Sequence, residues 1–155
     1  MASFTRESFM SATKTLAAAL PALQPEDAGA RLLLFGVRQM GAHGLHDACT
    51  AHAFVTAFGK GFQRPLVLLR ALMAEMSAAS AGPIQIAPWC CARMTGPEAM
   101  LLEVIGQIRT NPVRANMLLA DLLGVRDAAS IGFTAHALAN AFADLALPLE
   151  QVSDG

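Results

Sequence analysis

Prolines and glycines divide this sequence into apolar segments, each about as long as one α-helix. Pro25 and Pro65 stand where helices would begin, and Gly41, Gly59 and Gly124 stand where helices would end. The apolar residues recur at helical spacing, and the alternation that strands need is rare. The sequence therefore predicts helices over residues 6–20, 25–41, 45–58, 65–79, 95–109, 111–124 and 128–145.

Two further features support these helices. Alanine, the residue with the highest helix propensity, supplies 31 of the 155 residues. Thr95 and Glu98 have the spacing of a capping box, in which each side chain satisfies the other residue's backbone N–H at the start of a helix. Apolar residues nearly encircle the helix predicted over 25–41, so we expect this helix at the centre. Segment 82–93 is predicted to be irregular, with 83–88 extended between two prolines.

The composition indicates more apolar surface than a solitary globule of this size needs. Apolar residues make up 54% of the chain and charged residues only 15%, against typical values of about 45–50% and about 25%. A membrane, a partner chain or a ligand cavity could cover the surplus. No stretch of about 20 apolar residues without charges or prolines is present, so we expect no membrane span. A symmetric homodimer is the simplest alternative.

The sharpest chemical pattern combines histidine and cysteine. His46, Cys49 and His52 are spaced by three residues, so a helix would place them on one arc. Cys90 and Cys91 could complete a site for zinc or another transition metal if their segment folded over that helix. The sequence has neither a Cys-x-x-Cys pair nor a His-Glu-x-x-His motif. A small cysteine beside partly exposed histidines, with no cofactor, is therefore the simpler interpretation.

Cys91 is also a candidate reactive thiol. It precedes the predicted capped helix, whose N-terminus favours a nearby thiolate, and Arg93 would add positive charge. A thiol enzyme also needs a positioned base, which the sequence does not identify. We expect no catalytic residue, and an inert cysteine next to Trp89 is the alternative.

Residues 119–136 resemble a helix-turn-helix module in which Leu119–Val125 would form the end of the first helix and the turn. The second helix would begin near Arg126, but its residues offer almost nothing to phosphates or base edges. The net charge of the chain is −1, and no basic run is present. An ordinary pair of antiparallel helices closed by Gly124 is the simpler interpretation, and we expect no nucleic-acid partner.

Two phrases carry a resemblance to a known family. They are the segments 38–48 (RQMGAHGLHDA) and 87–95 (APWCCARMT). Together they resemble a family of small, uncharacterised alphaproteobacterial proteins of unknown function, over residues 30–142. The resemblance implies a bacterial protein and no particular activity. Members of that family often have a third cysteine where this chain has Trp89, which argues against a metal role for the segment.

The predicted fold is all-α, a single compact domain of about six or seven helices, bundle-like or orthogonal. It spans residues 1–155, with a core at about 6–146 and a frayed tail after Pro148. Three cysteines form no secreted disulfide framework, so we expect a cytoplasmic protein. The leading functional hypothesis is a non-enzymatic interaction or regulatory protein that forms a homo-oligomer, most simply a dimer. A metal- or redox-dependent module and a DNA-binding regulator are the alternatives, and no ligand is specified.

Overall fold

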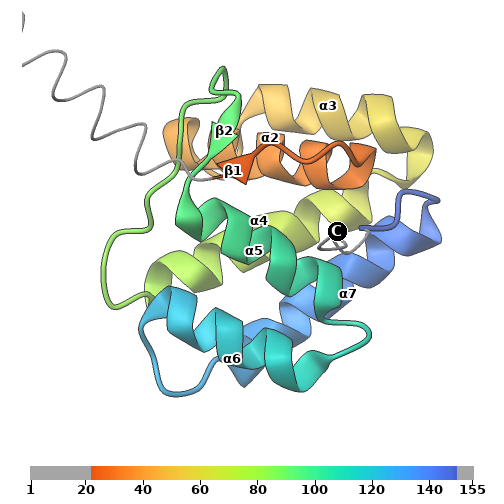
Figure 1. The fold of residues 1–155 in the computed structure, drawn as a ribbon. Helices are drawn as coiled ribbons and strands as arrows, with labels where there is room; N and C mark the ends of the chain where they lie inside the picture. Colours follow the sequence, from red (N-terminus) through yellow and green to blue (C-terminus); the bar gives the residue numbers. More distant parts are fainter. Residues whose placement is uncertain (1–21, 150–155) are drawn as a thin grey trace, which may run out of the picture.

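The computed structural model describes residues 22–149, which form an almost entirely helical domain (Figure 1). Six α-helices and one short 3₁₀ helix occur within these residues. The helix predicted over residues 6–20 and most of the predicted frayed tail lie outside them. The elements are β1 (Ala22–Leu23), α2 (Ala28–His43), α3 (Ala48–Phe58), η1 (Gly59–Gly61), α4 (Gln63–Ala79), β2 (Arg93–Met94), α5 (Gly96–Gln107), α6 (Pro112–Leu123) and α7 (Ala129–Asp144).

Each helix begins and ends at a residue with a local physical reason to do so. Asp27, Asp47 and Asn111 each accept a hydrogen bond from the backbone N–H three residues later, which caps α2, α3 and α6. Gly124 ends α6 with a φ of 67°, in the left-handed region that glycine adopts without strain. These local signals explain why six of the predicted helices are confirmed to within a few residues.

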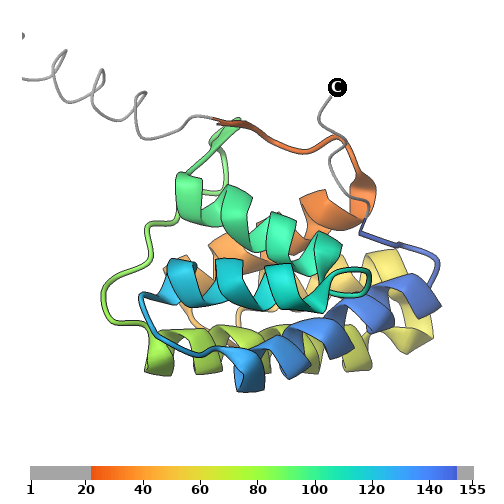
Figure 2. The same ribbon diagram turned by 60° about the horizontal axis from the view of Figure 1, so that its bottom comes forward.

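The helices associate as antiparallel neighbours. α2 packs on α3, and α5 packs on α6. α4 runs antiparallel to α7, because Arg64 pairs with Asp144 near one end and Glu75 contacts Thr134 further along. Figure 2 shows α4 and α7 side by side, with α5 and α6 lying above them.

The core forms where α2, α3, α4, α5 and α7 meet. Leu33 and Leu69 are fully buried there, and the expectation that α2 is central is confirmed, since most of its residues are buried. Phe54, Phe58 and Phe142 pack edge to face, with ring centroids 5.1–6.0 Å apart, and join α3 to α7. Within the described residues, no helix is both long and apolar enough to cross a membrane.

A two-stranded antiparallel pair departs from the purely helical expectation. Ala22 lies opposite Met94, and Leu23 lies opposite Arg93. Strands of two residues carry no detectable alternation, so the sequence did not predict them. The pair brings the start of the described chain beside the segment that enters α5 (Figure 1).

Candidate functional site: an apolar pocket closed by a strap

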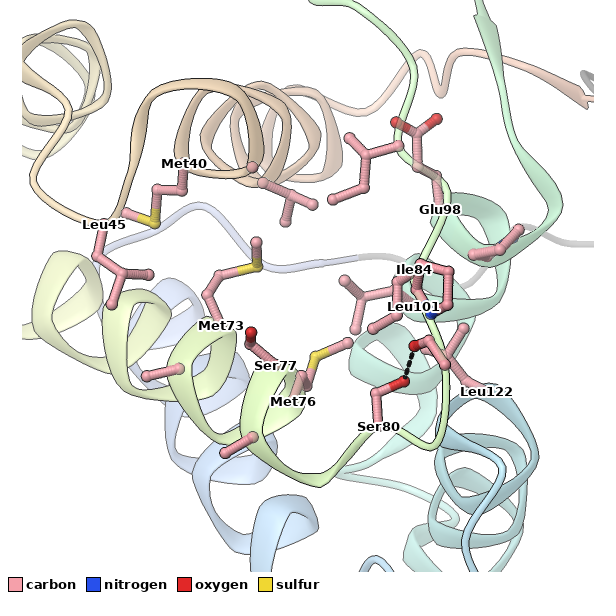
Figure 3. A pocket seen from close by; sticks show the side chains of 18 of the residues that line it. Met40, Leu45, Met73, Met76, Ser77, Ser80, Ile84, Glu98, Leu101 and Leu122 are labelled. Atoms are coloured by element: carbon pink, nitrogen blue, oxygen red, sulfur yellow. Dashed lines mark hydrogen bonds between the residues drawn. The ribbon is translucent and has the colours of Figure 1, made fainter.

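A pocket of about 540 Å³ lies between the C-terminal part of α2, the C-terminal half of α4 and the start of α5 (Figure 3). The irregular segment 82–94, here called the strap, joins α4 to α5 and closes one side of it. The lining is Val37, Met40, Gly41, Gly44, Leu45, Met73, Ala74, Met76, Ser77, Ala78, Ser80, Gly82, Pro83, Ile84, Ile86, Pro97, Glu98, Leu101 and Leu122. Most of these side chains are aliphatic or thioether groups, so the pocket suits apolar matter.

Glu98, in the first turn of α5, holds both ends of the strap. Its Oε1 accepts a hydrogen bond from the backbone N–H of Ala87 at 2.9 Å. Its Oε2 accepts from the backbone N–H of Thr95 at 2.9 Å, while the Thr95 hydroxyl accepts from the Glu98 N–H. The predicted capping box is therefore confirmed. The Thr95 hydroxyl also donates to the carbonyl oxygen of Gln85 at 2.8 Å, which adds a third attachment.

Arg38, on α2, compensates the buried charge of Glu98. Its Nε donates to Glu98 Oε1 and its Nη2 to Oε2, both at 2.9 Å, and each side chain is only 1% exposed. The same guanidinium donates to the carbonyl oxygens of Cys91 and Arg93, both at 2.7 Å. The planar fork of arginine permits these four directed bonds at once. Arg38 thus fixes the strap to α2 from inside the protein.

Ile86 closes the strap against α2 on the pocket side. A Cβ placed on Gly41 would lie 2.9 Å from the Cδ1 of Ile86, so the absence of a side chain at Gly41 lets the strap approach the helix. Ile84 lies further along the strap and also lines the pocket (Figure 3). The strap is therefore a wall with an apolar inner face and a polar attachment behind it.

Polar groups are few in this pocket. Glu98 is saturated by its four hydrogen bonds, and the Ser80 hydroxyl donates to the carbonyl oxygen of Gly82 at 2.6 Å. Ser77 supplies the other side-chain hydroxyl. A second hollow of about 510 Å³, between the end of α5 and α7, has Arg109, His136 and Asn140 among its lining. Because that lining is largely polar, the first pocket is the better site for an apolar molecule.

Comparison with known families places the chain in one of them. A sequence model described as a family of unknown function (DUF6628) matches residues 7–147. The chain belongs to this family. No curated protein and no solved structure matched the chain.

The predicted metal ligands of this DUF6628 protein are spread over two parts of the fold. His46 lies exposed in the turn before α3, and Cys49 and His52 lie exposed on α3. Cys90 is exposed and Cys91 half-buried in the strap. Among residues 22–149, no three His, Cys, Asp or Glu side chains are grouped so that they could hold a metal ion. The metal hypothesis remains a prediction.

The candidate reactive thiol, Cys91, contributes its backbone to the site. Its carbonyl oxygen accepts hydrogen bonds from Arg38 and from the Gln24 side chain, and its N–H donates to the Pro88 carbonyl oxygen. It therefore lies directly after a tight turn that Trp89 and Cys90 form. Trp89 is 62% exposed, so it does not cover the thiols as a buried ring would.

The segment that resembles a helix-turn-helix module forms α6, a turn and α7. α7 contains no lysine or arginine, and its Ile131, Ala135 and Leu138 are buried in the core. Ser130 and Phe133 are exposed on this helix. The surface of α7 therefore offers no cation to a phosphate backbone, and DNA binding remains a prediction without support from this helix.

Sequence reasoning missed the pairing of Arg38 with Glu98. Glu98 was interpreted only as a capping residue, and Arg38 only as part of a family phrase. One signal was available, because an arginine among the apolar residues of a central helix needs a buried partner. Met40, Met73 and Met76, expected to be core, line the pocket as well.

Proposed function

We propose that this protein binds an apolar small molecule in the pocket between α2, α4 and α5. The observation that carries the proposal is the pocket itself, about 540 Å³ with a predominantly apolar lining. Ligand sites typically have volumes of about 300–1,000 Å³, apolar walls and a few placed polar groups. A bound molecule would also cover part of the apolar surface that the composition places in excess.

The walls of the pocket support this proposal because they differ in rigidity. Leu101 and Val37 are almost fully buried and belong to the core. Ile84 and Ile86 are half-buried and come from the strap, whose backbone makes no regular helix or strand between residues 82 and 92. A rigid wall facing an irregular one gives a ligand a fixed surface and a route of entry.

The test uses an uncharged fluorescent probe, N-phenyl-1-naphthylamine, titrated with the full chain. We expect one probe per chain with a Kd on the order of 10 µM, from a few tenths of a kcal/mol per ligand atom. Ile84→Trp fills the pocket and should reduce probe binding at least tenfold. Val67→Trp adds the same side chain at an exposed position of α4 outside the lining and should leave binding unchanged. No saturable binding, or equal binding by the two variants, contradicts the proposal.

Self-association is the second candidate function, and exposed apolar side chains around α6 and α7 favour it. Val113 and Met117, one turn apart on α6, are 72% and 65% exposed, and Phe133 on α7 is 77% exposed. Asn116 and Gly132, their chain neighbours, are in contact between the two helices. The three side chains therefore surround one helix junction, as the core of a homodimer interface would.

Sedimentation equilibrium of the full chain tests this second candidate. A dimer at micromolar concentration that becomes a monomer in Phe133→Gln supports it. Val55→Gln, which changes an exposed apolar residue of α3, is the matched control and should remain a dimer. A monomeric parent protein would contradict the candidate without affecting the pocket.

A further inference from the structure

We infer that the ligand of the pocket is an uncharged, flexible chain with one hydroxyl or carbonyl group, held with that group at Ser77. This inference rests on the proposed function and specifies the chemistry of the molecule that the pocket accepts. It follows from the charges, the free polar groups and the side-chain types of the lining.

An anionic head group has no counter-charge in this pocket. The lining contains no lysine, arginine or histidine. Arg38, behind Glu98, already makes four hydrogen bonds to Glu98, Cys91 and Arg93. A buried anion would instead meet the carboxylate of Glu98. Burial of an unpaired charge is strongly unfavourable, so a fatty acid in its charged form is disfavoured.

A cationic head group is disfavoured for a different reason. Glu98 Oε1 accepts from Arg38 Nε and from the Ala87 N–H, and Oε2 accepts from Arg38 Nη2 and from the Thr95 N–H. A carboxylate offers about four acceptor positions, and all four are occupied. The charge of Glu98 is also balanced by Arg38. An ammonium group would find no oxygen of Glu98 available to it.

Ser77 is the polar group left for a ligand. Its side chain lies beside Met76 and Met73 at the pocket (Figure 3). Ser80, one turn later, uses its hydroxyl for the Gly82 carbonyl. Among the described residues, no hydrogen-bond partner of the Ser77 hydroxyl occurs. One hydroxyl that donates and accepts matches one alcohol or carbonyl group of a neutral ligand.

The rest of the lining suits a flexible chain better than a flat ring system. Met40, Met73 and Met76 bring three thioether side chains to the pocket, and no aromatic residue lines it. Methionine is unbranched and adapts its shape to its neighbours, whereas ring systems are usually held between aromatic faces. The lining therefore fits an alkyl chain of medium length that adapts along with the methionines.

A matched ten-carbon series tests the inference by displacement of N-phenyl-1-naphthylamine. The probes are 1-decanol, decanoate and decylamine at pH 7, where the last two carry opposite charges. We expect 1-decanol to bind at least tenfold more tightly than either charged compound. Ser77→Ala should weaken 1-decanol about fivefold, the effect of one hydrogen bond, without changing binding of the probe. Ser130→Ala, at an exposed serine of α7 outside the lining, should change neither.

The outcomes separate this inference from the proposed function. Equal binding of decanoate and 1-decanol, or unchanged 1-decanol affinity in Ser77→Ala, overturns the inference while the pocket remains a ligand site. Probe binding that none of the ten-carbon compounds displaces also overturns it. Failure of the probe itself to bind removes the proposed function, and the inference with it. Because Ser77 is exposed, circular dichroism of Ser77→Ala should match that of the parent protein.

Discussion

Arg38 and Glu98, 60 residues apart in the sequence, form a buried ion pair with 2.9 Å between Nε and Oε1. The pair joins α2 to α5, and the remaining donors and acceptors of both side chains bind the backbone of the strap. One wall of the pocket therefore depends on a single polar cluster. Loss of either partner leaves the other charged and without water.

Replacement of Arg38 by methionine should cost about 3–5 kcal/mol in the free energy of unfolding, because the charge of Glu98 would remain buried without a partner. The carbonyl oxygens of Cys91 and Arg93 would each lose the hydrogen bond from Arg38 as well. Urea denaturation measures the change. Arg38→Met combined with Glu98→Leu should be more stable than Arg38→Met alone, since both charges are then absent.

The control for Arg38 is an ion pair of similar length on the surface. Arg64 Nη1 lies 2.8 Å from Asp144 Oδ2, but both side chains are more than half exposed. Arg64→Met should therefore cost less than about 1 kcal/mol. Equal losses in Arg64→Met and Arg38→Met would contradict the role given to the buried pair.

Thr95→Val should destabilise the protein by about 1–2 kcal/mol, because it removes the hydroxyl that caps α5 and binds the Gln85 carbonyl. Valine preserves the shape of threonine, so the loss reports the two hydrogen bonds. Thr56→Val is the matched control: the hydroxyl of Thr56 bonds only within α3 and is exposed, and its loss should change stability by less than about 0.5 kcal/mol. Thermal or urea unfolding measures both, and a neutral Thr95→Val would refute the capping role.

Gly132→Ala should cost about 1–3 kcal/mol through steric overlap. A Cβ at Gly132 would lie 1.9 Å from Oδ1 and 3.0 Å from Cγ of Asn116, where α7 crosses α6. Asn116→Ala removes the obstacle, so Asn116→Ala with Gly132→Ala should recover most of the loss in urea denaturation. If the double variant stays as unstable as Gly132→Ala, the close approach of the helices is not the cause.

The same glycine shows where sequence reasoning stops. In the sequence, Gly132 only weakens a predicted helix, since glycine has a low helix propensity. The structure gives the reason for its presence, a contact with a residue on another helix. Helix boundaries were predictable because caps and glycine ends act within four residues. Contacts between helices depend on how the chain folds back, which a single sequence does not encode in any local pattern.

The pocket was out of reach for a related reason. Its methionines have helical spacing, which is equally typical of core residues, and they are partly both. The strap was correctly expected to be irregular, but nothing in 82–93 indicated which helix it would cover. That position follows from Arg38, whose partner carbonyls at Cys91 and Arg93 lie more than 50 residues away.

The three cysteines provide a test of the strap as it is described here. Cys49 and Cys90 are exposed and Cys91 is half-buried, so we expect iodoacetamide to label the first two faster than Cys91. Peptide mass spectrometry at successive times measures each rate, and the urea-unfolded chain should show three similar rates. In Arg38→Met, which frees the Cys91 carbonyl from the guanidinium, the Cys91 rate should rise toward that of Cys90. Labelling of Cys91 ahead of Cys90 in the parent protein would contradict this order and favour the reactive-thiol hypothesis, because exposure alone could not explain it.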